Sequence, residues 1–488
     1  KCGGFRAGCQ QQKAEGRSQK PEIGIPDSRL TAHRSPLTSH PSPPLPANVA
    51  GELRALDLTA CLHQACDFLL RWQIGVETHA DDYWDPKRGW IKRPCAAWMC
   101  GAFPGDWFLG GAHDEQGRVW RMGSGPIWHT GQAIWALAMA RARFNGAARE
   151  RLDRALAEGG HYLTRLQILE GPNRGAFWTP PHSLPPGWNA GTEATGVYMM
   201  PGEWVEPKQK LCTSDMSEAV GGLLTAGDLL KDPAMIETCR RWGEWLAREV
   251  NFKPGYYYHW FSANQPGGSE MKRFWQPDDG VQGLLAVKFN NADWLQRYHD
   301  GVKRCIEWPI DLKEYPAQQA RSFYWNSSFL WPVIDGRVPG DRGQGHPGKG
   351  DRDRALKKLE EYTRWLLGLV EPDGMVGFKY QDKGGLEDRL GTSGDGAATA
   401  MGARMCYQLW RNTGDPRWCE AAVPLLRWIV KAQMRGPEAN GHDGAIPFCR
   451  WMLDAKTGKR FQFMRSISTI FAIMALSEWR GLVEERKS

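Results

Sequence analysis

The chain has 488 residues, of which 41% are hydrophobic and 24% are charged, and its net charge is +7. This composition is that of a globular protein and excludes a wholly disordered or fibrous chain. The sequence contains no run of about 18 apolar residues, which argues against a membrane-spanning helix. Outside the first 50 residues it shows no basic stripe of the kind that binds nucleic acid, so we expect no nucleic-acid partner.

The first 49 residues differ in composition from the rest of the chain. They contain seven prolines and no tryptophan, and the segment PSPPLP at 41–46 favours extended polyproline geometry. We predict a disordered, proline-rich tail over 1–49 and a single domain over 50–488. The chain begins with Lys1 rather than Met, and Phe5–Cys9 ahead of a polar tract resembles a bacterial lipoprotein junction. We therefore expect a targeting segment before residue 1 and a periplasmic or secreted location.

Tryptophan is unusually frequent, with 25 residues of which Trp72 is the first, and glycine is also abundant, with 56 residues. A buried indole N–H needs a hydrogen-bond partner, so many tryptophans are costly to hide completely. Their number, together with glycine-rich loops, favours aromatic surfaces that line a groove, and such surfaces suit the apolar faces of sugar rings. The alternative is a tryptophan-rich core.

In chain order, the first kind of element is an amphipathic helix with apolar residues at i, i+3, i+4 and i+7 and one polar face. A polar face indicates contact with solvent, so we predict that these helices lie outside. They cover 55–73, 152–166, 235–246, 293–308, 356–369 and 418–432.

Between them lies a second kind of helix, which is apolar or small on nearly every face. A helix without a polar stripe must be surrounded by protein, so we predict that these helices lie inside. They cover 129–144, 215–230, 278–289, 323–335, 395–411 and 465–482.

The connections alternate in length. Turns from an inner to the next outer helix are short, with 336–350 as the exception, whereas links from outer to inner helices are long. This pattern predicts an all-α fold, a closed (α/α)6 toroid of six helical hairpins with the long loops at one mouth. The inner helices would begin at that mouth. An open stack of helical pairs is the alternative, but it does not explain why the inner members lack a polar face.

The alternation over about 53–482 resembles the six-hairpin glycosidase-like superfamily. The segment DMSEAVGGLLTAGDLLKDP at 215–233 is similar to an inner helix and turn of unsaturated glucuronyl hydrolases, and 395–418 has a related helix–TGD–helix pattern. The resemblance implies an enzyme that acts on a uronate-containing glycan, with Asp215 as acid/base. The second aspartate of those hydrolases, on the preceding inner helix, has no match here, because position 129 is His.

Acidic residues begin several of the predicted inner helices. Glycosidic cleavage needs a proton donor and usually a second carboxylate across the sugar ring. We predict Asp215 as the acid/base and Asp279 as its partner carboxylate. An acid beside Trp275 or Trp325 would have the raised pKa that proton donation requires. The alternative is helix capping, because Asp215-x-x-Glu218 matches a capping box.

Other polar and aromatic residues of the same helix starts and long loops are predicted to bind substrate. An arginine can hold a uronate carboxylate through two parallel hydrogen bonds. The predicted substrate-binding residues are Trp128, His129, Glu218, Tyr257, His259, Arg273, Trp275, Asp278, Gln282, Tyr324, Trp325, Asn326, Asp395 and Arg465.

The predicted function is a glycoside hydrolase that acts on a uronate-containing oligo- or polysaccharide. A polysaccharide lyase is the first alternative, with β-elimination by His129, Tyr324, Asn326, His259 and Arg465. The second is a carbohydrate-binding toroid without activity. No cofactor and no metal are expected, because acidic segments such as 81–82 and 371–373 lack a calcium-loop pattern. The sequence leaves the oligomeric state open.

Overall fold

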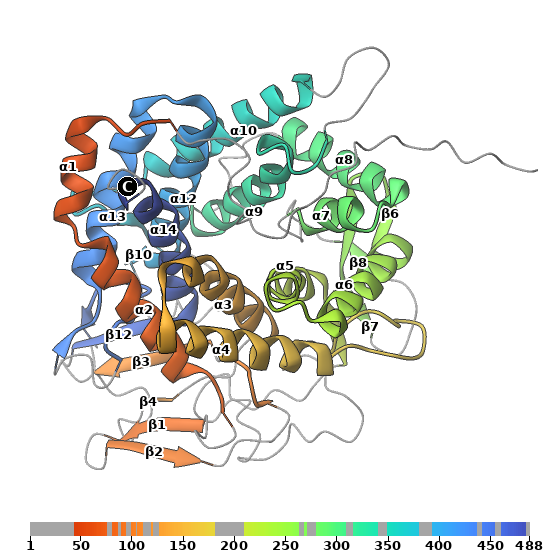
Figure 1. Cartoon of the computed structure of the whole chain (residues 1–488), viewed down its shortest axis with the longest axis horizontal. Coiled ribbons are helices and arrows are strands. Elements are labelled where there is room, and N and C mark those ends of the chain that lie inside the picture. Colours follow the sequence, from red (N-terminus) through yellow and green to blue (C-terminus); the bar gives the residue numbers. More distant parts are fainter. Residues whose placement is uncertain are drawn as a thin grey trace, which may run out of the picture. The chain divides into compact units, whose positions relative to one another are not determined.

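The computed structural model describes part of the compact unit Ser39–Ser488. The described residues are 43–75, 81–85, 89–93, 99–103, 105–110, 119–120, 126–180, 209–262, 268–270, 280–308, 316–339, 349–379, 393–436, 442–453 and 460–484. Within this unit the helices form two concentric layers (Figure 1).

The inner layer is a closed ring. Each inner helix contacts the next one along the chain, and α14 contacts α3, so the ring closes. Every residue of α12 from Gly396 to Trp410 is buried, as expected for a helix without a polar stripe. The inner helices are α3 (Pro126–Ala140), α5 (Thr213–Leu230), α7 (Val281–Lys288), α9 (Pro316–Ile334), α12 (Gly396–Thr413) and α14 (Ser466–Glu484). The predicted closed ring is confirmed, and an open stack is excluded.

The outer layer covers this ring. Five outer helices pack on the inner helix that precedes them, and the first outer helix, α2, packs on the last inner helix, α14. The two ends of the helical array therefore meet. The outer helices are α2 (Leu58–Trp72), α4 (Gly146–Arg165), α6 (Pro233–Trp245), α8 (Ala292–Glu307), α10 (Lys349–Leu367) and α13 (Pro416–Ala432).

A further helix, α1 (Ala47–Ala55), contacts α13 and α14. Leu45 and Val49 are buried. The predicted boundary at residue 49 therefore lies inside a helix, and 43–49 belong to the folded domain. Most of the predicted tail lies outside the described residues.

The short inner-to-outer turns carry helix caps. Asp232 accepts hydrogen bonds from the backbone N–H groups of Ala234 and Met235, and Asn291 and Asp415 cap α8 and α13 in the same way. Pro233 and Pro416 then occupy the first helical position, where a missing N–H costs nothing. The sequence therefore forces a sharp turn at one end of the ring.

The long connections contain short strands, which we did not predict from the sequence. Every strand in the described ranges lies in one of these outer-to-inner connections. The strands are β1 (Asp81–Asp85), β2 (Gly89–Arg93), β3 (Asp106–Gly110), β4 (Val119–Trp120), β5 (Lys210–Cys212), β6 (Asn251–Lys253), β7 (Tyr256–Ser262), β8 (Gly268–Glu270), β9 (Val376–Lys379), β10 (Ser393–Asp395), β11 (Met452–Leu453) and β12 (Arg460–Arg465).

The strands pair across different connections. The sheets have the orders β2-β1-β4, β10-β9, β11-β12-β3 and β5-β7-β6, and β8 also pairs with β7. Antiparallel pairing of β12 with β3 joins the connection before α14 to the connection before α3. Pairing of β5 with β7 joins those before α5 and α7. These pairings place the long connections together at the starts of the inner helices.

Glycine sets how closely α3 and α5 approach. A Cβ at Gly131 would lie 2.3 Å from the Cα of Ala219, and one at Gly222 would lie 2.0 Å from the carbonyl oxygen of Gly131. Because both clashes involve backbone atoms, no side-chain rotation could relieve them. Gly131 therefore fixes the position of the two inner helices that carry Asp215 and His129.

Gly131→Ala is expected to destabilise the fold by about 1–3 kcal/mol or more, the usual cost of overpacking. The measurement is urea unfolding followed by circular dichroism. Gly51→Ala is the matched control, because nothing lies within 4 Å of a Cβ at that exposed helical position. The control should be neutral or stabilising, since alanine favours a helix over glycine. Equal stability of the two variants would contradict the packing argument.

Candidate functional site

Asp215 lies in the first turn of the inner helix α5 and is partly exposed. The helix begins at Thr213, two residues earlier than predicted, and its N-cap position is Cys212, which makes no side-chain cap hydrogen bond. The capping alternative for Asp215 therefore does not hold, because Asp215 lies inside the helix rather than at its N-cap position. Its carboxyl group is available for another task.

The pKa of Asp215 is raised from 3.8 to about 7. The main cause is desolvation of the carboxyl group, and a hydrogen bond from the Cys212 side chain partly opposes it. A helix N-terminus favours the charged form of an acid, so desolvation outweighs the helix dipole here. A carboxyl group that titrates near neutrality can both donate and accept a proton at physiological pH.

Cys212 links the start of α5 to strand β7. Its Sγ lies 3.2 Å from Ser214 Oγ and 3.7 Å from His259 Nε2. The thiol is buried, and its pKa is raised by desolvation and by the charge of Asp215. The contact between Cys212 and His259 could not be predicted from the sequence, because it depends on the pairing of Cys212 with Trp260 between β5 and β7.

His129 is buried in the first turn of α3. Its Nδ1 lies 2.8 Å from Ser466 Oγ at the start of α14, and its ring stacks on Trp128 with 3.7 Å between ring centroids. Desolvation, and then the positive charge of Arg465, hold its pKa well below the usual value, so the imidazole is neutral. Arg465 itself lies over the Phe448 ring at 5.2 Å.

Two more contacts link neighbouring elements at the same end of the ring. Gln132 Nε2 on α3 lies 3.5 Å from Glu218 Oε2 on α5, a long hydrogen bond between buried side chains. Tyr257 on β7 donates its hydroxyl proton to Gln282 Oε1 on α7 at 3.1 Å. Together with the contacts of His129 and Cys212, they connect α14, α3, α5, β7 and α7.

Several buried polar atoms at these helix starts have no hydrogen-bond partner among the described residues. They include His129 Nε2, Thr213 Oγ1, Gln282 Nε2 and Ser468 Oγ. Buried polar groups are nearly always paired, so each unpaired one needs an explanation. Four of them lie at the starts of four inner helices, where ordered water or a bound ligand would satisfy them.

Asp395 and the residues of α9 have contacts that favour structural roles. Asp395 is buried and caps α12 by accepting a hydrogen bond from Ala398 N at 2.9 Å, so the capping alternative holds there. Helix α9 begins at Pro316, before the predicted start at 323. Tyr324 to Asn326 therefore lie inside the helix rather than at its first turn.

The side chains of these α9 residues are buried in packing contacts. The Tyr324 hydroxyl accepts a hydrogen bond from Arg404, and Trp325 packs edge-on against Tyr324 with ring centroids 5.0 Å apart. Asn326 contacts Cys305 on α8 and Tyr362 on α10, which are outer helices. These contacts favour core packing over substrate binding for all three.

Four predicted site residues lie outside the described residues: the partner carboxylate Asp279 and its neighbour Asp278, and the loop residues Arg273 and Trp275. Their assigned roles remain predictions.

Among the described residues, no cluster of three or more His, Cys, Asp and Glu side chains could hold a metal ion. The two acidic side chains of the 371–373 segment form ion pairs with an arginine. Arg450 forms ion pairs with Glu371 at 2.7 Å and with Asp373 at 2.9 Å.

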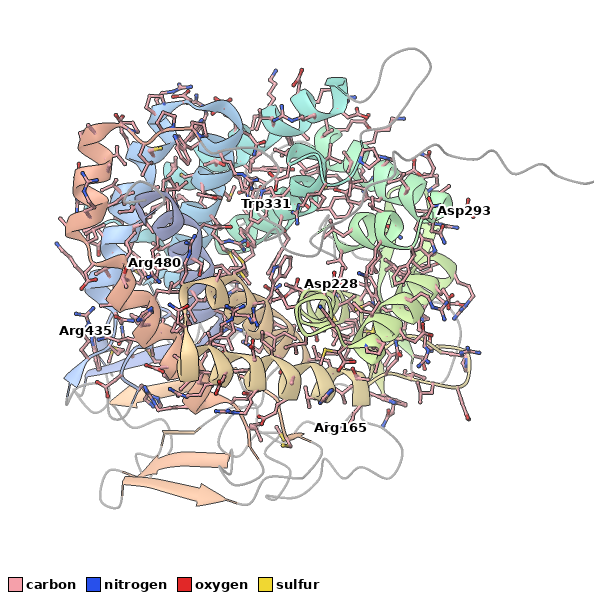
Figure 2. All side chains as sticks on the ribbon, in the orientation of Figure 1. Arg165, Asp228, Asp293, Trp331, Arg435 and Arg480 are labelled. Carbon is pink, nitrogen blue, oxygen red and sulfur yellow. The ribbon has the colours of Figure 1, made fainter. Side chains whose placement is uncertain are left out.

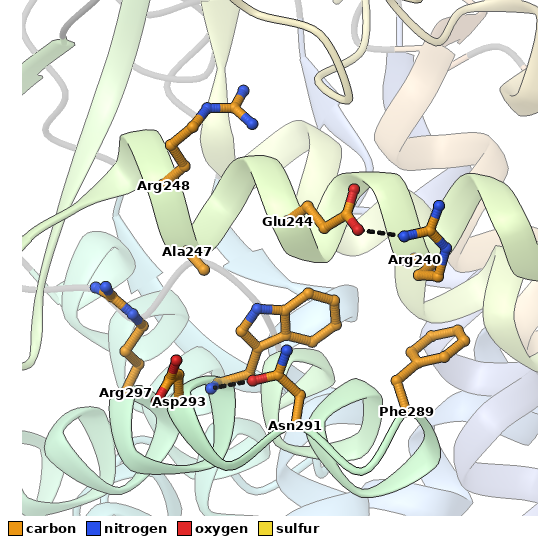
Figure 3. Close-up of a pocket in the computed structure, with 9 residues that line it drawn as sticks. Arg240, Glu244, Ala247, Arg248, Phe289, Asn291, Asp293 and Arg297 are labelled. Atoms are coloured by element: carbon orange, nitrogen blue, oxygen red, sulfur yellow. Dashed lines mark hydrogen bonds and ion pairs between the residues drawn. The ribbon is translucent and has the colours of Figure 1, made fainter. Parts of the chain in front are cut away.

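A groove of about 610 Å³ lies between the outer helices α6 and α8 (Figure 3). Its ionic groups are partly paired with one another, since Arg240 binds Glu237 and Glu244. Phe289 and Trp294 form an edge-on aromatic pair in it. The groove is lined by residues of α6, α8 and the segments next to them and contains none of the polar residues at the inner-helix starts, so the candidate site stays at the mouth.

In the described part of the chain, no helix is both long enough and apolar enough to cross a bilayer.

No protein-family model matches the sequence, and no curated protein matches it. Solved structures do match the fold. A cellobiose 2-epimerase from Spirochaeta thermophila DSM 6192 has a TM-score of 0.56 at 12% identity, covering 91% of this chain and 99% of the epimerase.

An unsaturated glucuronyl hydrolase specific for heparin has a TM-score of 0.52 at 11% identity and covers 88% of this chain and 98% of its own. A cellobiose 2-epimerase from Bacillus thermoamylovorans B4167 has a TM-score of 0.53 at 9% identity, covering 88% and 98%. The arrangement of the inner and outer helices and the likeness to these solved structures indicate the same fold. The chain has an (α/α)6 toroid fold, the fold it shares with these solved structures.

Proposed function

We propose that this protein is a carbohydrate-active enzyme, a glycoside hydrolase that uses Asp215 as a general acid/base on a uronate-containing oligo- or polysaccharide. The observation that carries the proposal is Asp215 itself. It is a partly exposed carboxyl group at the start of an inner helix, it caps nothing, and its pKa is about 7. A proton donor to a glycosidic oxygen needs such a group.

Other residues at the starts of the inner helices support a saccharide as ligand. Unpaired buried polar atoms such as His129 Nε2 and Gln282 Nε2 would find partners in sugar hydroxyls. Arg465 supplies a positive charge close enough to His129 to lower its pKa, and a uronate carboxylate would be attracted to that charge. The second carboxylate of the mechanism is assigned to Asp279, as the sequence predicts.

The contacts of Tyr324 and His129 help to distinguish the lyase alternative from hydrolysis. Elimination needs an acid at the leaving oxygen, and Tyr324 was one candidate for it. Its hydroxyl is buried and accepts a hydrogen bond from Arg404, which favours a structural role. A neutral His129 with an unpaired Nε2 remains a candidate base for elimination or for isomerisation. Hydrolysis is favoured because Asp215 has the matched pKa.

A screen of acidic and neutral oligosaccharides, read by mass spectrometry and ultraviolet absorbance, tests the proposal. Hydrolysis adds one water to the products, whereas elimination adds none and creates an absorbing double bond. Isomerisation leaves the mass unchanged but alters the retention time. Cleavage of an acidic oligosaccharide with gain of water is the expected result. Binding without turnover of any oligosaccharide in the panel would favour the non-catalytic toroid.

The pH dependence of the reaction should follow Asp215. A general acid must be protonated in the free enzyme, so kcat/KM is expected to fall as the pH rises through about 7, the pKa of this carboxyl group. An acid with an ordinary pKa near 4 would already be inactive at neutral pH. The measurement is kcat/KM from pH 4 to 9 with a substrate found in the screen. A profile without a limb near pH 7 would remove Asp215 as the proton donor.

A further inference from the structure

A second group of buried charges lies at the ends of the inner helices that are opposite the mouth. Asp335 directly follows α9, and Arg411 lies in the last turn of α12. The side chain of Asp335 is 3% exposed and that of Arg411 is 5% exposed. Charged groups at this depth are costly unless they are paired and hydrogen-bonded. Asp215 lies in the first turn of α5, at the mouth, so these charges are separate from the candidate site.

Two arginines approach one oxygen atom of Asp335 without reaching hydrogen-bond distance. Asp335 Oδ2 lies 3.7 Å from Arg337 Nη2 and 3.9 Å from Arg411 Nη1. Hydrogen bonds between such groups are at most about 3.2 Å long. The other oxygen, Oδ1, accepts a hydrogen bond from Asn412 Nδ2 at 3.2 Å. The two guanidinium groups therefore converge on one atom, but their ion pairs with it are not hydrogen bonds.

Most of the unpaired polar atoms in this cluster are donors. Among the described residues, Arg411 Nη1 and Arg337 Nε are buried and have no hydrogen-bond partner. The same is true of Trp331 Nε1, one helical turn before Asp335, and of Gln408 Oε1, about one turn before Arg411. Three of these four atoms carry N–H groups, so the cluster lacks acceptors. An anion can accept hydrogen bonds from such groups, whereas a cation would be repelled by them.

The formal charges of the cluster also favour an anion. Among the described residues it contains three guanidinium groups and two carboxylates, so one positive charge is in excess. These groups belong to Arg337, Arg352, Arg411, Asp335 and Asp353. Arg352 on α10 joins the cluster by donating to Asn412 Oδ1 at 3.0 Å. The nearby buried pair of Arg404 and Glu478 adds no net charge. A monovalent anion would balance the excess.

We propose that the ends of α9 and α12 opposite the mouth form a binding site for a small monovalent anion, chloride, with Arg411 and Arg337 as its main ligands. The anion accepts hydrogen bonds from the two guanidinium groups and balances their excess charge. A small anion is favoured because the Arg411 side chain is almost completely buried. The site joins α9 to α12 and, through Asn412 and Arg352, to α10. It does not depend on the proposed function.

Thermal unfolding of the full chain at increasing chloride concentration tests this site. Sodium chloride replaces sodium gluconate in each sample, so the anion changes while the ionic strength stays constant. A ligand that binds only the folded chain raises the Tm as its concentration increases. We expect a rise of roughly 1–4 °C when the chloride concentration is about five times its Kd. Bromide, which has the same charge and a similar size, should have a similar effect.

Substitution of the arginines should remove the effect of chloride. Arg411→Gln deletes the charge and the buried guanidinium donors, so its Tm should not depend on chloride. Arg337→Gln should weaken chloride binding roughly tenfold or more, as expected for a lost hydrogen bond to a charged group. Arg417→Gln is the matched control, because Arg417 lies at the same end of the ring and pairs with Asp415 at the surface. The control should keep the full chloride effect.

The width of the 35Cl NMR signal gives a second measurement below the unfolding temperature. Exchange with bound chloride should broaden the signal with the native chain and with Arg417→Gln, but not with Arg411→Gln. If Arg411→Gln does not fold, Arg337→Gln keeps the test informative, because its side chain is 25% exposed. A native Tm that does not respond to chloride would show that water satisfies these donors. An equal response in the native chain and in the folded arginine variants would show a general salt effect. Either result overturns the proposal.

Discussion

Asp215→Asn should lower kcat by roughly 10²–10⁴-fold, the usual contribution of a general acid or base. Asparagine keeps the size of the side chain but cannot transfer the proton. The measurement is kcat on the substrate identified by the screen. Asp228→Asn is the matched control, because Asp228 lies near the other end of the same helix and pairs with Lys288 at the surface. The control should retain activity.

The same substitution should stabilise the protein at alkaline pH. The pKa of Asp215 rises from its ordinary value of 3.8 to about 7 in the folded chain, so folding disfavours the charged form of the carboxyl group. The contribution of Asp215 to the free energy of unfolding is therefore most favourable below about pH 4, and it is lost as the pH rises toward 7. Asp215→Asn removes that loss, so it should resist urea better than the native chain at pH 8 but not at pH 4. Full activity, or lower stability at pH 8, would contradict the assignment.

Glu478→Ala should destabilise the fold by about 3–5 kcal/mol, because it leaves a buried charge unpaired. Glu478 on α14 is fully buried and pairs with Arg404 on α12 at 3.0 Å. Burial raises the pKa of Glu478, and the charge of Arg404 offsets part of this rise. The guanidinium group also lies 4.8 Å from the ring centre of Trp331 on α9 (Figure 2). The pair therefore joins three inner helices.

Urea unfolding of the two variants Glu478→Ala and Glu52→Ala measures this effect. Glu52 pairs with Arg427 at the surface, where such pairs contribute less than about 1 kcal/mol. The double variant Arg404→Met with Glu478→Leu should recover much of the loss, because it removes both charges and keeps the volume. A cost for Glu478→Ala as small as that of Glu52→Ala would show that the buried pair does not hold the ring together.

The pattern of the helices was predictable from the sequence. The polar stripe of the helix at 418–432 and its absence from 395–411 placed the first outside and the second inside. Hydrophobic burial depends on which face of a helix is apolar, and the sequence states this directly. Short turns with Asp-Pro, as at 232–233 and 415–416, predicted where hairpins close.

The site was predictable only in part. Asp215 was identified by its place at the start of an inner helix, and its raised pKa agrees with that role. Asp395 occupies a similar place in sequence, yet it caps α12. The two differ because α5 begins two residues before Asp215, whereas α12 begins one residue after Asp395. A helix start is uncertain by a residue or two in sequence, and that uncertainty decides between a cap and a free acid.

By itself, the sequence determined the two-layered helical ring and the candidate acid. Both depend on local periodicity and on residue type. Tertiary structure alone decided the surroundings of that acid, because Cys212, His259 and Ser466 reach the site through strand pairing and helix contacts between distant segments. Desolvation of Asp215 is likewise a property of the assembled fold. The local sequence does not show how much water is excluded from Asp215 by residues that are distant in the chain.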